Sequence, residues 1–427
     1  MLPSIWILIR VTIISKYANA ELETFISWEY LNIVLEVIQE SVLLPLFWWL
    51  AKISKDKEDI KKIQEVYILI FILFLLILFI ISFFTSHLIN SVGMDGDSQI
   101  IFFLLQLWSR LPTILFSISL IIMIKMNLNI AVILCLITKI ILMVAFDLTL
   151  ANKDVFLNSY IGIGISTLIT ETTVFIISIF VIAKHFGFKD FLKINKQSFK
   201  VSNLKINRQL VINVLSCFVL SFVNNFLYMF MVLKNINLSN AATSYWLSNT
   251  IIWQWILIIP NALILISKDI ISKESKVNLT NKKRLFILME FICLSLASLL
   301  LMTLIFGLTF KPIANVISNN NPGVSFNIFI FTIWFFISYI ICQNINVIFI
   351  AEGKNHILLI SGIISNICIY VPYIVLSACD IIDMNLETTI IMFSTGLIIS
   401  TIVAVPALAI YLKREKKKWV EKNSQAK

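Results

Sequence analysis

The sequence carries little charge for its length. Charged residues occupy 14% of the 427 positions, whereas hydrophobic residues occupy 59%. Soluble domains carry about 25% charged residues, so this composition excludes a water-soluble globular protein. It predicts a chain that is embedded in the lipid bilayer.

Residues typical of catalytic and metal sites are also scarce. The sequence has three histidines, and its six cysteines lie in or beside apolar segments without metal-ligand spacing, so we interpret the cysteines as small core residues. No Walker loop, zinc motif or nucleophile elbow occurs. His185 and Asp190 have the spacing found in glycerolipid acyltransferases, but the other sequence blocks of those enzymes are missing. We therefore expect no enzyme, no cofactor and no metal site.

Twelve apolar segments are long enough to cross a bilayer. A hydrocarbon core about 30 Å thick requires about 20 residues of helix, because backbone amides cannot remain unpaired in lipid. The segments cover residues 2–19, 25–51, 66–92, 99–125, 128–150, 158–186, 208–233, 238–267, 285–310, 324–351, 356–379 and 387–412. The sequence thus predicts an all-α integral membrane protein with twelve transmembrane helices.

The positive charges are distributed unevenly between the connecting loops. With both termini in the cytoplasm, the inner loops and tail carry 27 of the 34 Lys and Arg residues, and the outer loops carry three. This asymmetry follows the positive-inside rule. The net charge of +10 therefore indicates orientation in the cytoplasmic membrane and contact with anionic lipid, not a nucleic-acid site.

The loop pattern repeats once along the chain. A long basic loop follows the second segment (51–64) and recurs after the eighth (268–284), and tight turns follow the fourth and tenth segments. We expect an N-terminal six-helix lobe (1–187), a cytoplasmic linker (188–207), a C-terminal six-helix lobe (208–412) and a basic tail (413–427). Two such lobes enclose a central cleft, which favours transport by alternating access.

Four stretches carry a resemblance to a known family. They are the loop AKISKDKEDIKKIQ, Gly93 in LINSVGMDG, NAATSYWLSNTIIWQWILIIPNALI in the eighth segment, and AEGKNHILLISGIISNICIYVPYIVL with Pro372. Together and in this order they resemble the MATE branch of the multidrug, oligosaccharide-lipid and polysaccharide (MOP) exporter superfamily. The major facilitator fold also has six plus six helices, but its signature between the second and third segments is rich in Gly and Arg. The first loop here has neither residue, so we set that family aside. The resemblance implies a secondary antiporter, and we expect a monomer.

Ionisable residues inside spans are the candidate coupling and substrate residues, because each costs about 2.5–3.5 kcal/mol at a helix centre. Most lie in the first half, and the second half offers amides instead. The full candidate set is Arg10, Glu36, Glu40, Arg110, Lys139, Asp147, Glu171, Asn224, Asn225, Asn249 and Gln254. The structural alternative is that the carboxylates pair with neighbouring cations and the amides join helices.

The resemblance also identifies a reversal of charge. The Asp that the family places in its first segment aligns with Arg10, and the family's Asn and Asp of the fifth segment align with Lys139 and Met143. A tethered ammonium or guanidinium then stands where the family binds a sodium ion or proton. We expect Glu36, Glu40 or Glu171 to balance it.

The sequence leaves three functions open. The first is ion-gradient-driven export of small cationic or amphipathic organic compounds by a MATE-like multidrug efflux antiporter, with H+ favoured over Na+ as coupling ion. The second is a flippase for lipid-linked oligosaccharide or another anionic lipid, which the cations favour. The third is a transport-inactive relative with a structural role.

Overall fold

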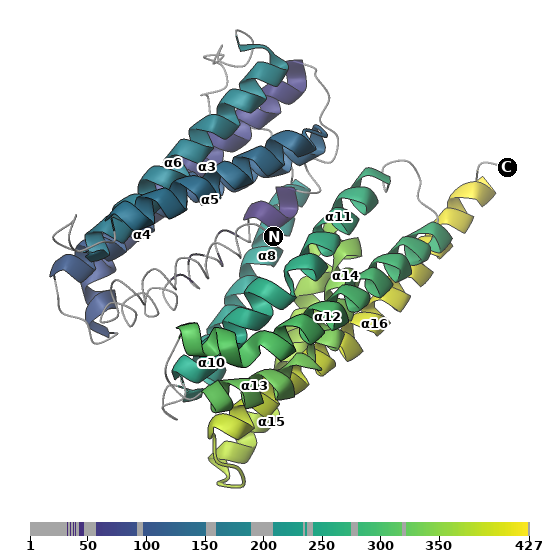
Figure 1. Ribbon diagram of the computed structural model, residues 1–427. Coiled ribbons are helices and arrows are strands. Elements are labelled where there is room, and N and C mark those ends of the chain that lie inside the picture. Colours follow the sequence, from purple (N-terminus) through teal and green to yellow (C-terminus); the bar gives the residue numbers. More distant parts are fainter. Residues whose placement is uncertain are drawn as a thin grey trace. The chain divides into compact units, whose positions relative to one another are not determined.

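The computed structural model is built from helices and turns over the residues that it describes (Figure 1). These are residues 57–91, 97–150, 159–188, 208–233, 235–236, 242–274, 281–317 and 322–425, with isolated positions between 32 and 46. The chain divides into two compact units. The N unit consists of Leu2–Gln39 and Lys52–Asn207. The C unit consists of Met1, Glu40–Ala51 and Arg208–Lys427.

The N unit has four described helices. They are α3 (Lys57–Ser91), α4 (Asp97–Lys125), α5 (Asn129–Leu150) and α6 (Ser159–Phe186). α6 packs along both α4 and α5, and α3 packs on α4. α4 is the most buried of the four, whereas α5 exposes most of its surface. The core of the unit therefore lies between α4 and α6.

The C unit is arranged around one central helix. Its elements are α8 (Arg208–Leu227), the π-helical segment η3 (Tyr228–Leu233), α10 (Ala242–Thr250), the π-helical segment η4 (Ile251–Ile256), α11 (Ile258–Glu274), α12 (Asn281–Ile317), α13 (Pro322–Ile333), α14 (Phe336–Ala351), α15 (Asn355–Ala378) and α16 (Leu386–Gln425). α14 packs against α11, α12, α15 and α16. Its Val347, Ile348 and Phe349 are fully buried in the core, against which Leu44 also packs.

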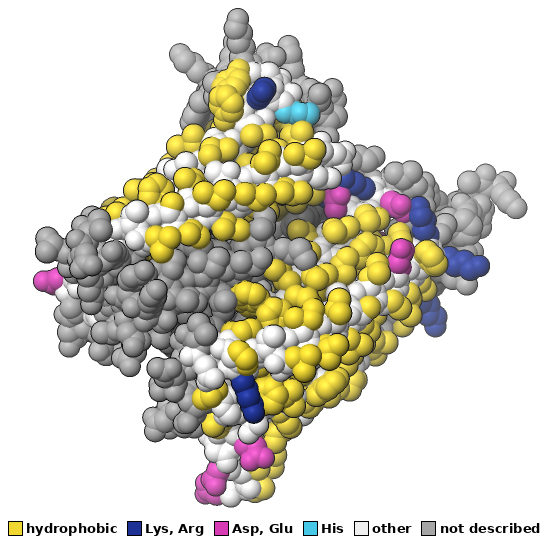
Figure 2. All heavy atoms as spheres, in the orientation of Figure 1, with side chains coloured by type: hydrophobic (Ala, Val, Ile, Leu, Met, Phe, Trp, Pro, Cys, Tyr) yellow, Lys and Arg dark blue, Asp and Glu magenta, His cyan; other side chains and the backbone are white. Residues whose placement is uncertain are grey.

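The described helices agree with the predicted transmembrane segments. Among the described residues, eight continuous helices are long and apolar enough to cross a membrane, and the number rises to ten if each of two bent pairs is one span. The predicted segment 2–19 and most of 25–51 lie outside the described residues. Large hydrophobic side chains cover the visible helix surfaces, whereas charged side chains gather toward helix ends (Figure 2). The prediction of an all-α, multi-pass membrane protein is confirmed.

Two predicted spans are broken in the middle. Ser244–Ile256 and Ile258–Glu274 meet at an angle of 48°, and so do Pro322–Ile333 and Phe336–Ala351. Pro260 accounts for the first break, because it lacks the N–H that the carbonyl of Ile256 would accept in a continuous helix. In η4 the backbone widens to a π-helix, and Leu257 N–H donates to the carbonyl of Ile252 at 2.9 Å.

The tight turns after α4 and α14 have the same hydrogen-bond pattern. Leu128 N–H donates to Met123 at 2.9 Å, and Lys354 N–H donates to Phe349 at 2.7 Å. Each turn contains one residue of positive φ, Asn127 (59°) or Gly353 (66°), as a Schellman cap requires. The repeat seen in the sequence is therefore also present in the backbone of the two turns.

Candidate functional site

A seam of polar side chains runs through the interior of the N unit. On α6, Ser166, Thr167, Thr170 and Glu171 are all buried, and their spacing of three and four residues places them on one helix face. α5 presents Lys139 and Asp147 eight residues apart, with the buried Met143 between them. Because α5 and α6 pack together, the two sets of polar groups meet across the helix pair.

The central contact of this seam is an ion pair. Lys139 Nζ lies 2.5 Å from Glu171 Oε1, and the two side chains are 15% and 5% exposed. Lys139 also lies over the ring of Phe116, 5.5 Å from its centroid. At 1.5 Å per residue, Lys139 is about 15 Å along α5 from its first residue, which places the pair near the middle of the span. Glu171 is one of the three carboxylates named above as a possible partner of Lys139.

Two further hydrogen bonds extend the seam, one of them near the C-terminal end of α5. Ser166 Oγ donates to Asp147 Oδ1 at 2.5 Å, and Gln106 Nε2 of α4 donates to Thr167 Oγ1 at 3.0 Å. All four side chains are buried. Polar groups thus link α4, α5 and α6, in a region where an uncompensated polar group would be costly.

Two glycines allow α6 to approach its neighbours closely enough for these contacts. A Cβ at Gly162 would lie 1.9 Å from the carbonyl oxygen of Leu150, and one at Gly164 would lie 2.9 Å from Leu105. Any side chain at Gly162 would therefore push α6 away from the end of α5. Both glycines lie within four residues of Ser166.

The other candidates from the sequence that the structure describes lie on α4, α8, α10 and η4. Arg110 is partly buried on α4, whereas Arg10, Glu36 and Glu40 lie outside the described residues. In the C unit, Asn224 accepts a 2.7 Å hydrogen bond from Asn366 Nδ2 of α15, and Asn225 Nδ2 donates to Ser221 within α8. Asn249 on α10 and Gln254 in η4 are partly exposed.

Sequence reasoning missed a second charged cluster, at the turn between α14 and α15. Glu352 Oε1 lies 2.9 Å from Arg284 Nε of α12, and Glu352 Oε2 accepts a hydrogen bond from the Tyr411 hydroxyl of α16. Burial raises the pKa of Glu352, against the lowering effects of Tyr411 and Arg284. The available signal was the acidic residue in the AEGK turn, which lies outside the predicted spans and so was not among the candidate residues.

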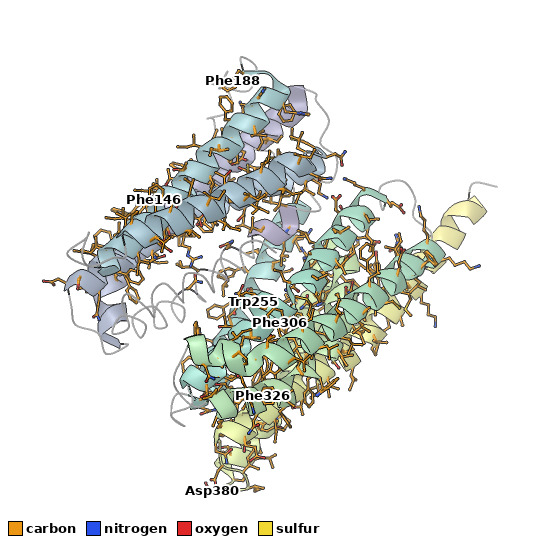
Figure 3. The ribbon with its side chains drawn as sticks, viewed as in Figure 1. Phe146, Phe188, Trp255, Phe306, Phe326 and Asp380 are labelled. Carbon is orange, nitrogen blue, oxygen red and sulfur yellow. The ribbon has the colours of Figure 1, made fainter. Side chains whose placement is uncertain are left out.

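Aromatic residues surround the break after η4. Trp253 meets Phe336 and Tyr339 edge-on, with ring centroids 5.5 and 5.0 Å apart, so it joins the two broken spans. Trp255 packs edge-on against Phe306 of α12 at 5.2 Å (Figure 3). These tryptophans therefore have packing partners in the protein.

Known proteins resemble this chain in structure. No protein-family model and no curated protein matches the sequence. A MOP superfamily transporter from Pyrococcus furiosus, whose binding pocket has reversed polarity suggesting a different function, matches with a TM-score of 0.74 at 14% identity, over 97% of this chain and 93% of that one. A mutant of the Vibrio cholerae MATE transporter VcmN matches with a TM-score of 0.72 at 14% identity, over 97% and 94%. An outward-facing multidrug resistance MATE transporter also scores 0.72 at 14% identity, over 97% and 92%.

The chain has the MATE transporter fold. This confirms the resemblance inferred from the sequence at the level of the fold, over nearly the whole chain. The solved structures that share this fold include multidrug resistance MATE transporters of the MOP superfamily.

Proposed function

We propose that this protein exports small cationic or amphipathic organic compounds across the cytoplasmic membrane by alternating access, as an antiporter driven by protons. The observation that carries the proposal is the contact between Lys139 and Glu171 in a buried seam of a MATE-fold protein. A paired charge in the middle of a span is costly, and such residues commonly mark ion pathways. The MATE fold supplies the framework for alternating access.

The pairing favours a proton over sodium as the coupling ion. The ammonium of Lys139 occupies one oxygen of Glu171, so a sodium ion would have to displace it. A proton needs no such displacement, because Glu171 Oε2 has no hydrogen-bond partner in the described part of the chain. Protonation there would neutralise the carboxylate and release Lys139.

The remaining partners follow from the charge distribution and the fold. The basic inner loops support an orientation with both termini in the cytoplasm and contact with anionic headgroups. Arg414 and Lys413 follow the apolar part of α16, which continues as a helix to Gln425. We propose a monomer, because each MATE-fold chain contains both halves of the repeat.

Transport in proteoliposomes tests this function. Ethidium movement is measured in sodium-free buffer, with and without an imposed proton gradient, for the native protein and for Glu171→Gln and Lys139→Gln. We expect gradient-driven movement that both substitutions abolish. Glu290→Gln is the matched control, because Glu290 is exposed on α12, and it should transport normally. A requirement for sodium, or full activity in both seam variants, contradicts the proposal.

A flippase for lipid-linked oligosaccharide or another anionic lipid is the second candidate. The reversed charge at Lys139 favours it, and so does the fold match to the Pyrococcus furiosus transporter with its pocket of reversed polarity. In this case an anionic headgroup would take the place of Glu171 beside Lys139. Movement of a fluorescent anionic lipid between leaflets, without ethidium transport, would select this function. Failure of both assays would select the transport-inactive alternative.

A further inference from the structure

Helices α8 and α15 of the C unit pack side by side along a regular seam. Leu220 Cδ1 would lie 2.2 Å from a Cβ at Gly362, and Asn366 Nδ2 donates to Asn224 Oδ1 at 2.7 Å. Both contacts join residues separated by 142 positions in the chain. Two contacts of equal separation show that the helices run parallel and in register.

The same register brings a second pair of amides to one level. Asn213 lies seven residues before Leu220, and Asn355 lies seven residues before Gly362. Seven residues are close to two helical turns, so both asparagines lie on the contacting faces. We call Asn224 and Asn366 the bonded pair, and Asn213 and Asn355 the unbonded pair.

The two pairs differ in burial and in bonding. Asn213 and Asn355 are each 1% exposed, yet neither Nδ2 nor Oδ1 of either side chain has a hydrogen-bond partner in the described structure. The bonded pair is more exposed to its surroundings. A buried amide without partners is strongly unfavourable, whereas an exposed amide can bond elsewhere. In the present arrangement of α8 and α15, the buried pair, for which missing hydrogen bonds cost more free energy, is therefore the pair without them.

The pairs lie on opposite sides of the closest contact. At 1.5 Å per residue, the unbonded pair is about 10 Å from the level of Leu220 and Gly362 in one direction, and the bonded pair is about 6 Å away in the other. Gly362 has no side chain, so Leu220 can turn against the backbone of α15 there. Because the two pairs lie on opposite sides of this contact, a small rotation about it would bring one pair together and move the other apart.

We infer that α8 and α15 form a two-position seam, in which the bonded and unbonded asparagine pairs exchange roles as the C unit changes conformation. The inference rests on the proposed alternating access and adds the element that switches. Neutral amides suit this role, because each can donate and accept in either position. Breaking one pair is compensated by forming the other.

Cross-linking tests the exchange directly. The six native cysteines are replaced, and Asn224→Cys, Asn366→Cys, Asn213→Cys and Asn355→Cys are introduced as two pairs, separately and together. Disulfides need Cα atoms about 4.4–6.8 Å apart. We expect each pair alone to cross-link, and the first disulfide formed in the four-cysteine protein to prevent the second. The inference would be overturned by molecules that carry both disulfides. It would also be overturned if the cysteines introduced at Asn213 and Asn355 never form a disulfide.

Leucine at the unbonded pair separates switching from structure. Replacing Asn213 and Asn355 together by Leu removes the unpartnered amides, so the protein should unfold at a higher temperature. Transport should nevertheless fall at least tenfold, because the second position loses its hydrogen bonds. A purely structural role predicts higher stability with unchanged transport, and that result would refute the seam. Because the four-cysteine test needs no transport, its failure and the failure of the proposed export are distinguishable.

The pivot is tested by a compensating pair. Gly362→Ala should prevent the exchange of cross-links, because its Cβ would overlap Leu220, and adding Leu220→Ala should restore it. Gly307→Ala on α12 is the control, since a Cβ there meets its nearest neighbour at 3.9 Å. If Gly362→Ala leaves the exchange of cross-links unchanged, the contact is no pivot.

Discussion

The ion pair of the N unit allows a quantitative prediction. At an effective dielectric constant of about 20, unit charges about 4 Å apart attract by about 4 kcal/mol. Truncating one partner of a buried pair costs about 3–5 kcal/mol, because the other charge is left without compensation. For Lys139→Met we expect the free energy of unfolding to fall by about 3 kcal/mol. This is the lower end of the range, because the Lys139 side chain is still 15% exposed. Glu171→Gln should cost a similar amount.

A double-mutant cycle measures the coupling. The free energy of unfolding is determined in mixed detergent micelles for the native protein, both single variants and Lys139→Met with Glu171→Gln. The double variant should be much less destabilised than the sum of the singles, since it leaves no buried charge unpaired. The exposed pair of Lys283 and Glu274, 2.8 Å apart with 58% and 33% exposed side chains, should show a coupling below about 1 kcal/mol. Additive losses at Lys139 and Glu171 would refute the reasoning.

Three further predictions concern other parts of the described structure. Gly162→Ala should destabilise the fold by about 1–3 kcal/mol through overpacking against Leu150, whereas Gly323→Ala, with no neighbour within 4 Å of its Cβ, should unfold at the native temperature. Burial raises the pKa of Glu352 above 4.5 in the folded protein. Its contribution to stability is therefore fully present below pH 4.5 and is lost as the pH rises through the pKa of the folded state. The unfolding temperature of Glu352→Gln should accordingly fall less than that of the native protein as the pH rises through this range. Asp147→Asn keeps an acceptor for Ser166, so it should cost less stability than Asp147→Leu in the same unfolding assay.

Much of the fold could be predicted from hydropathy and charge. The predicted segment 128–150 matches α5 (Asn129–Leu150), and 158–186 matches α6 (Ser159–Phe186). Membrane spans are predictable because lipid requires long apolar helices. The breaks at Leu257 and at residues 334–335 were missed, because an apolar segment has the same hydropathy whether straight or bent. Pro260 was the one local signal of the first break.

The candidate site was predicted only in part. The sequence identified Lys139 as a buried cation that needs a carboxylate, but it could not choose Glu171 among three possible partners. That choice depends on how close α6 approaches α5, which Gly162 and its contact with Leu150 permit. Glu352 was missed for a different reason, because it lies in a turn outside the predicted spans. Its partners, Arg284 and Tyr411, also come from helices far apart in the sequence.

The two units differ in the kind of polar contact that they bury. In the N unit, Lys139 and Glu171 form an ion pair whose separation leaves a buried charge without a partner, so this contact is costly to break. In the C unit, the proposed exchange breaks one neutral hydrogen bond between asparagines of α8 and α15 as it forms another. The proposed transport cycle requires both a group that binds the coupling ion and helices that change position. We therefore propose that the seam of α5 and α6 binds the ion, and that Asn213, Asn355 and the bonded pair accompany the conformational change within the C unit.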